Sequence, residues 1–253
     1  MEILKNFDNW ALDVFGIENP RNELSGLKKY FDFIIKNHNR IQGDIAEFGV
    51  FNGKSLLATA LILKELKSKK KIYGFDSFKG LANFHKNDGF KLFNDQYKKK
   101  EINKKNFQDH KKLVKFKLLH LQRSVTPQNI STSLAFANSN LKLLKQKIKY
   151  LKLNNIVIIK GDFKNTLRDK KIPFKKLMAV NMDCDLYESY NQVLFPIHDY
   201  LAKNSMISLD EYYSLKFPGP RKSVNEFLKK NKDYFLKSFN KKFCFPRYYL
   251  IKK

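Results

Sequence analysis

Short apolar runs recur along this chain and alternate with longer stretches of helical periodicity. Each run spans four to six residues and is rich in β-branched, aromatic or other apolar side chains, which is typical of a buried strand. The last two runs are expected to form a closing antiparallel hairpin. Together the runs predict strands at residues 45–50, 71–75, 155–159, 177–182, 206–209, 235–239 and 247–251.

Helical patterns fill most of the intervals between these strands. Leu24, Leu27, Phe31 and Ile34 recur at helical spacing, so the region 1–40 is expected to be helical, with a break at residues 19–20 before that helix. Strands that alternate with helices form mostly parallel sheets with helices on both faces, so the pattern predicts an α/β fold. Further helices are expected at residues 53–66, 134–151, 188–201 with a bend near Pro196, and 221–230.

Residues 82–150 separate two strands by far more chain than an ordinary connection needs. This segment is dense in Lys, Asn, Gln and Phe, and a long insertion of this kind in a compact domain usually forms a lid or a binding loop. No second domain boundary is evident. We therefore expect one domain over residues 1–253, with an N-terminal helical region at 1–40 and a lid at 82–150.

The chain carries a net charge of +26, from 50 basic and 24 acidic residues. Such a charge attracts nucleic acid, anionic membranes or phosphorylated substrates. Only six of the basic residues are arginine, the side chain that favours phosphate recognition, so solvated surface lysine is the preferred interpretation. A preference for acidic substrates or partners is the alternative.

Two cysteines far apart in the sequence argue against a disulfide framework and against a zinc cluster. The sequence has no apolar run of 18 residues and no basic start followed by an apolar block. We therefore expect neither a membrane span nor a secretion signal, and a cytoplasmic location.

A glycine turn and an acid mark a candidate site at the ends of the first two strands. Gly49 and Gly53 lie between the first strand and its helix, and Asp76 ends the second strand 23 residues after Gly53. A glycine turn allows a ligand to approach the backbone, and such an acid accepts hydrogen bonds from ribose hydroxyls. The pattern indicates a nucleoside-bearing cofactor, although the turn is not the pyrophosphate-binding G-x-G-x-x-G.

Acidic residues also follow the other strands, where ligands bind on parallel sheets. Asp183, Asp210 and Glu211 would repel one another unless a cation lay between them, and Mg²⁺, Mn²⁺ or Ca²⁺ suits such oxygen ligands. A metal there lowers the pKa of a substrate hydroxyl, and Asp185 is placed to accept the proton. Without a metal, one carboxyl would have a raised pKa. For Asp162, capping of the next helix is an equally good interpretation.

Five motifs in the same order resemble the macrocin O-methyltransferase family of sugar O-methyltransferases. They cover roughly residues 40–230, and the sequence F-D-S-F-x-G-L at 75–81 is matched in full. Three differences from the family motifs matter for the predicted site. Asn52 and Lys54 replace Arg and Gly of the first motif, and Glu211 replaces an aspartate of the fifth. The motifs lie at residues 43–54, 75–81, 161–167, 183–189 and 210–212.

The resemblance implies a Rossmann-like class I methyltransferase fold with a mostly parallel seven-stranded sheet. It also implies S-adenosylmethionine (SAM) as cofactor, a divalent metal such as Mg²⁺, and methyl transfer to a hydroxyl of a sugar-containing acceptor in a surface polysaccharide or natural product. By the family pattern, Asp185 would be the general base, and Asp183, Asp210 and Glu211 would hold the metal. The cofactor would contact Glu47, Gly49, Gly53, Ser55, Asp76, Ser77, Gly161, Asp162 and Asp183.

Two alternatives stay open at this point. An RNA methyltransferase would suit the positive charge, although no RNA-binding module is recognisable. A non-catalytic binding protein that kept the SAM fold would need no such set of acids. The sequence leaves the oligomeric state open, and a homo-oligomer is one of the states it allows.

Overall fold

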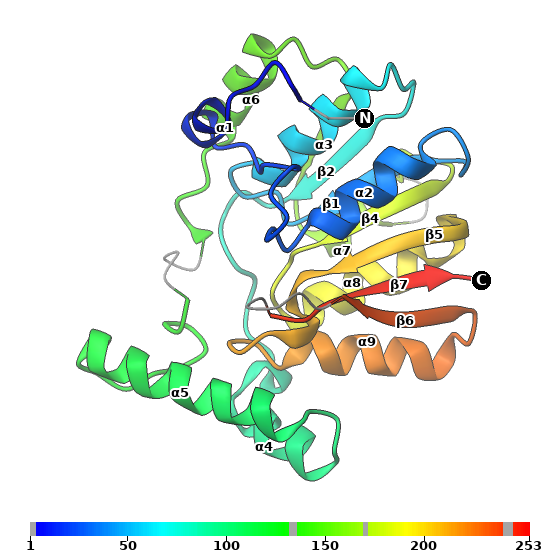
Figure 1. The fold of residues 1–253 in the computed structure, drawn as a ribbon. Coiled ribbons are helices and arrows are strands. Elements are labelled where there is room, and N and C mark those ends of the chain that lie inside the picture. Colours follow the sequence, from blue (N-terminus) through cyan, green and yellow to red (C-terminus); the bar gives the residue numbers. More distant parts are fainter. Residues whose placement is uncertain (1–3, 132–135, 169–171, 240–244) are drawn as a thin grey trace.

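A twisted sheet organises the computed structural model, which describes residues 4–131, 136–168, 172–239 and 245–253 (Figure 1). In these residues the sheet has seven strands in the order β3-β2-β1-β4-β5-β7-β6. The first five are parallel, and β7 pairs antiparallel with both β5 and β6. The strands are β1 Asp44–Phe48, β2 Ile72–Asp76, β3 Ile156–Lys160, β4 Leu177–Met182, β5 Leu201–Leu209, β6 Tyr234–Phe239 and β7 Arg247–Lys252.

Helices cover both faces of the sheet because successive strand residues point to opposite sides. On β1, Ile45 packs into a core with α2 and α3, whereas Ala46 and Phe48 pack into a second core with α8 and α9. The predicted α/β fold with helices on both faces is confirmed. The helices are α1 Asn9–Phe15, α2 Lys28–Asn37, α3 Lys54–Glu65, η1 Lys86–Asp88, α4 Lys91–Lys98, α5 Lys104–Leu121, α6 Leu141–Tyr150, α7 Phe163–Thr166, α8 Tyr187–Ile197, η3 His198–Tyr200, η4 Asp210–Tyr213 and α9 Gly219–Lys230.

Several predicted boundaries were wrong for local reasons. The break expected at Asn19 and Pro20 is present between α1 and α2, and it begins earlier, at Gly16, which adopts a left-handed conformation (φ 63°) and ends α1. Leu24 therefore precedes α2 and is 64% exposed. The helix expected to reach residue 201 ends at Ile197, since Leu201 already pairs with Leu177 in the sheet. The helix expected at 134–151 is α6, but it begins only at Leu141, where the Asn140 side chain caps it, so the predicted start at 136–140 was wrong. Residues 134 and 135 lie outside the described ranges.

The insertion between β2 and β3 carries α4, α5 and α6. Helices α4 and α5 project from one end of the molecule, whereas α6 returns to the side of α3 (Figure 1). Polar side chains of α4 and α5 bind main-chain oxygens around η4 and α9. These contacts are Gln96 Nε2 to Pro218 O (3.0 Å), Asn106 Nδ2 to Tyr213 O (3.4 Å) and His110 Nδ1 to Leu215 O (2.8 Å). None of the helices in the described ranges has the length and apolar character that crossing a membrane requires.

Gly49 permits the closest backbone contact in this arrangement. Its φ is 90°, and a Cβ added there would lie 1.7 Å from the carbonyl oxygen of Asp183. We expect Gly49→Ala to lower the free energy of unfolding by at least ~3 kcal/mol, because both strain and a backbone clash must be relieved. Urea denaturation measures this loss.

Gly89→Ala is the matched control. Gly89 has a φ of −71°, and the nearest atom to an added Cβ is Lys86 O at 3.3 Å. We expect a change within ~1 kcal/mol. Equal stabilities for the two variants would show that the end of β1 tolerates a side chain.

Candidate active site

A cleft of about 750 Å³ lies at the carboxyl ends of the parallel strands. Each strand contributes to its wall with the residue that ends or follows it, as expected for ligand sites on parallel sheets. Ser55, Ser77, Asp162 and Asp185 also line the cleft, so it gathers most of the residues that the sequence nominated. The strand-end residues are Gly49, Asp76, Gly161, Asp183 and Asp210.

Asp76 fixes the conformation of the turn after β1. Its Oδ2 accepts hydrogen bonds from the backbone N–H groups of Val50 and Phe51, each at 2.8 Å, and its Oδ1 accepts from Phe78 N at 2.6 Å. A carboxylate offers about four lone-pair positions, so the side chain retains acceptor capacity toward the cleft. Asp76 therefore has a structural role that the sequence did not reveal, beside its predicted cofactor role.

The three glycines that the sequence predicted for the cofactor site have different surroundings. Gly49 and Gly161 line the cleft, whereas Gly53 is outside the set of lining residues. Gly53 has a φ of 79°, and a Cβ there would meet the side chain of Leu144 on α6 at 2.4 Å. The structure thus places Gly53 where α3 begins and where the end of the insertion packs on the turn.

Glu47 lies behind the cleft wall and is fully buried. Ser55 Oγ donates a hydrogen bond to its Oε1 at 2.9 Å, and Asn181 Nδ2 lies 3.5 Å from its Oε2. Burial raises the pKa of Glu47 to about 8, and the nearby Asp183 adds to this shift. Glu47 therefore touches the cleft only through Ser55.

Ser77 and Asp162 lie at the rim of the cleft. Ser77 Oγ donates to Gly80 O at 3.4 Å and accepts from Lys79 N at 3.1 Å, so it stabilises the turn after β2. Asp162 precedes α7 but makes no side-chain capping hydrogen bond. The capping interpretation of Asp162 is therefore wrong, and its carboxylate is available to a ligand.

Three carboxylates meet at the cleft wall, where Asp183 and Asp185 line the cleft and the buried Glu211 lies behind them. One oxygen each of Asp183, Asp185 and Glu211 lie within 4.8 Å of one another. Burial raises the pKa of Asp183 to about 7, with repulsion from Asp210 as a further cause. Burial, followed by repulsion from Asp183, also raises the pKa of Asp185 and of Glu211. This donor set suits a hard divalent cation, whose charge would relieve the repulsion.

Asp210, a predicted metal ligand, is held by Arg247. The guanidinium of Arg247 on β7 forms an ion pair with Asp210 Oδ1 and also lies 3.3 Å from Asp210 O. Both residues line the cleft. The structure thus gathers Asp185 with Asp183 and Glu211, and Asp210 beside them in an ion pair. Arg247 is the first residue of the last predicted strand, and its position in the sequence does not indicate that it pairs with Asp210.

Other contacts orient the acidic residues. The Tyr190 hydroxyl on α8 donates to Glu211 Oε2 at 2.6 Å inside the core. Asp185 adopts a left-handed backbone conformation (φ 60°). This conformation costs energy for a residue other than glycine and is frequent at functional sites. Buried Asp88, from the insertion, accepts the N–H of Tyr187 at 2.8 Å and so secures the chain just after Asp185. Neither Tyr190 nor Asp88 stood out in the sequence.

Cys184, between two of these acids, is buried, and burial raises the pKa of its thiol. Its side chain packs in the core with α8 and α9. A neutral, buried thiol is a packing residue and a poor nucleophile.

Comparison with known proteins adds a family and a fold. The model of the family described as Macrocin-O-methyltransferase (TylF) matches residues 120–234, which confirms the resemblance that the motifs predicted. The matched range includes β3, β4 and β5 and the acids that follow them, and it covers three of the five motifs. No curated protein matches the sequence.

Solved structures support the same fold. The O-methyltransferase NovP is similar with a TM-score of 0.61 and 18% identity, over 91% of this chain and 79% of NovP. The calicheamicin methyltransferase CalS11 has a TM-score of 0.61 and 18% identity, over 95% of this chain and 82% of CalS11. An O-methyltransferase from Bacillus cereus in complex with SAH has a TM-score of 0.53 and 9% identity, over 99% and 94%. The class I methyltransferase fold is therefore confirmed.

The buried Glu47 predicts a distinct pH dependence of stability. Its pKa is raised from 4.5 in the unfolded chain to about 8 in the folded protein, so unfolding releases a proton between these values. Stability therefore falls as the pH rises from 4.5 to 8. Because Glu47→Gln stays neutral, we expect it to gain on the order of 3 to 5 kcal/mol relative to the wild type across this range.

Chemical denaturation of the ligand-free protein at several pH values measures this difference. The exposed Glu23, at 64% side-chain exposure, provides the control Glu23→Gln, whose difference from the wild type should stay nearly constant. A constant difference for Glu47→Gln as well would mean that Glu47 is ionised in the folded protein.

Proposed function

Since residues 120–234 match the macrocin O-methyltransferase family on a class I methyltransferase fold, we propose that this chain is a metal-assisted, SAM-dependent O-methyltransferase of sugars. The observation that carries the proposal is the cluster of Asp183, Asp185 and Glu211, of which the two aspartates line the cleft. A cofactor-binding fold alone would not require carboxylates within 4.8 Å of one another. The SAM sulfonium supplies the methyl group, and a divalent ion would supply positive charge beside the acceptor hydroxyl.

The cofactor would lie along the turn between β1 and α3. Gly49 lines the cleft at the end of β1, and Asp76 offers its remaining lone pairs to ribose hydroxyls. Ser55, Ser77, Gly161 and Asp162 line the same part of the cleft. Glu47 and Gly53 would act indirectly, by positioning Ser55 and the start of α3.

The metal would be held by Asp183 and Glu211, with Asp210 or Asp185 completing the protein ligands. Tyr190 fixes the Glu211 carboxylate, and Arg247 keeps Asp210 near the cluster. Magnesium is the preferred candidate because it takes few carboxylates and keeps several waters.

Asp185 would accept the proton of the acceptor hydroxyl as its oxygen attacks the methyl carbon. Its raised pKa makes it a better proton acceptor than an ordinary aspartate, and Asp88 and the strained backbone hold it in place. Ala82 and Asn83, where the insertion begins, line the cleft, so the segment 82–150 is positioned to act as a lid that excludes water.

The reaction of one similar protein supports a sugar as the acceptor. One structure of CalS11, at a TM-score of 0.52, is that of a TDP-rhamnose 3'-O-methyltransferase. We therefore begin with nucleotide sugars as acceptors and measure formation of S-adenosylhomocysteine (SAH) with and without Mg²⁺. Binding of SAM without turnover on any sugar, together with methylation of RNA, would favour the alternative substrate.

Asp185→Asn tests the general base. We expect turnover to fall by at least ~100-fold, because the amide cannot accept the hydroxyl proton. The affinity for SAH, measured by calorimetry, should change less than about twofold, since cofactor binding does not need this carboxylate. Asp199→Asn, at an exposed position beyond α8, is the control with the same charge change. Unchanged turnover in Asp185→Asn would remove Asp185 from this role.

Glu211→Gln tests the metal site independently of catalysis. The variant keeps the shape of the side chain but removes one anionic ligand. We expect Mn²⁺ binding, followed by electron paramagnetic resonance, to weaken at least ~10-fold, and chelation of divalent ions to abolish turnover of the wild type. A wild-type protein that binds no Mn²⁺, and that is as active with a chelator as without it, would exclude the metal role.

A further inference from the structure

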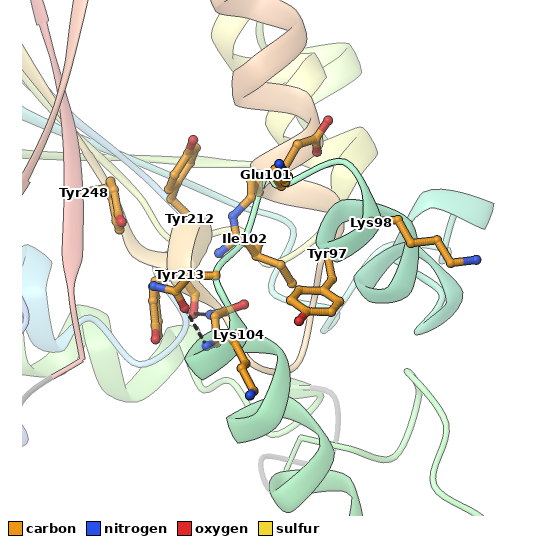
Figure 2. A pocket seen from close by; sticks show the side chains of 12 residues that line it. Tyr97, Lys98, Glu101, Ile102, Lys104, Tyr212, Tyr213 and Tyr248 are labelled. Carbon is orange, nitrogen blue, oxygen red and sulfur yellow. Dashed lines mark hydrogen bonds between the residues drawn. The ribbon is translucent and has the colours of Figure 1, made fainter.

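A second cavity lies on the other side of η4 from the cleft. It has a volume of about 760 Å³, within the range of small-molecule sites. Its walls come from the end of α4, the start of α5, η4, α9 and β7 (Figure 2). Asp210 and Arg247 face the cleft, whereas Tyr212 and Tyr248 line the second cavity, so η4 and β7 form a wall that both spaces share.

A buried guanidinium lines this cavity without an acidic partner. Arg221 on α9 is only 3% exposed. In the described part of the chain it makes one side-chain hydrogen bond, from Nη1 to Gln96 Oε1 at 3.3 Å, and no ion pair with a carboxylate. Its Cζ lies 5.4 Å from the ring centre of Tyr212. A buried charge is costly unless it is paired, so the position calls for an anion.

A second buried polar group points to the same conclusion. Asn106 on α5 lines the cavity and is 1% exposed, and its Oδ1 has no hydrogen-bond partner among the described residues. If Arg221 and Asn106 only stabilised the fold, we would expect their polar groups to form hydrogen bonds with each other. The cavity thus has a cation that lacks an anion and an acceptor that lacks a donor.

The rim and walls define the rest of the ligand. Three exposed lysines, Lys98, Lys100 and Lys104, stand at the rim, and Glu101 is the one acid among the lining residues. Tyr212 and Tyr248 lie with ring centres 4.6 Å apart, and both are visible at the wall in Figure 2. Aromatic rings of this kind pack against a sugar or a base, and arginine with lysines binds phosphate.

We propose that this cavity is a second binding site, separate from the cofactor cleft, for a phosphorylated small molecule whose phosphate pairs with Arg221. The ligand's organic part carries hydroxyl or N–H groups that reach Asn106 and a face that packs on Tyr212 and Tyr248. Nucleotides and sugar phosphates share this chemistry. The proposal does not depend on the reaction at the cleft.

Calorimetric titration of the full chain with three probes tests the site. The probes are inorganic phosphate, uridine monophosphate and glucose 1-phosphate. We expect binding of the phosphate group in each, and saturating SAH should leave it unchanged. Tighter binding of uridine monophosphate identifies a nucleotide site, and tighter binding of glucose 1-phosphate a sugar phosphate site. Failure of all three probes to bind, or their displacement by SAH, overturns the proposal.

Two sets of lysine variants separate this cavity from the general positive charge. The triple variant K98Q/K100Q/K104Q removes the rim lysines and should weaken binding about 10-fold. The triple variant K142Q/K145Q/K149Q removes the same charge from the exposed side of α6 and should change binding less than about twofold. Equal weakening in both would show that the anion binds only to diffuse surface charge.

The variant Arg221→Gln tests the proposed phosphate contact more directly than the lysine variants, provided that the variant protein folds. We expect phosphate binding to be lost while SAH affinity and the circular dichroism spectrum stay as in the wild type. Retained phosphate binding in a folded Arg221→Gln protein overturns the assignment. A wild-type protein that binds no SAH would contradict the proposed methyltransferase function. The phosphate titrations would still test the second binding site.

Discussion

The backbone contact between Gly49 and Asp183 is the constraint on which the site depends. Parallel pairing of β1 with β4 sets these two chain ends side by side, and the missing side chain of Gly49 lets the carbonyl of Asp183 lie against it. Asp183 N also donates to Phe48 O at 2.9 Å. The turn after β1 and the acidic cluster are therefore joined by direct backbone contacts.

Repulsion among the carboxylates at this junction destabilises the folded protein and favours binding of a cation. Asp183, Asp185 and Glu211 repel one another, and burial makes their charged forms costlier still. The protein offsets this with Tyr190 and Arg247, which bind Glu211 and Asp210 from the second core and from β7. A structure that holds acids in this way is preorganised, because little rearrangement is needed when a cation enters.

The sequence predicted the sheet and the ends of its strands well, because apolar runs and motif spacing are local signals. The strand 177–182 has the expected bounds, and Asp76, Asp183 and Asp162 lie at the cleft. Contacts between distant residues were beyond such signals. Nothing near Asp88 in the sequence indicates that it binds the backbone of Tyr187, and only the antiparallel placement of β7 beside β5 brings Arg247 to Asp210. The burial of Arg221 on α9 likewise depends on packing between distant parts of the chain and could not be predicted from local sequence.

The way in which α4 and α5 attach has an evolutionary consequence. Gln96, Asn106 and His110 bind main-chain oxygens of the core, which every amino acid provides. At these three contacts the core side of the junction can change in sequence, because only its main chain is bound. Arg221 and Phe217 are different, since their side chains contact Gln96 and the apolar residues of the insertion. Change in α4 and α5 is therefore coupled to the rest of the protein at a few side chains, and elsewhere the two parts can diverge separately.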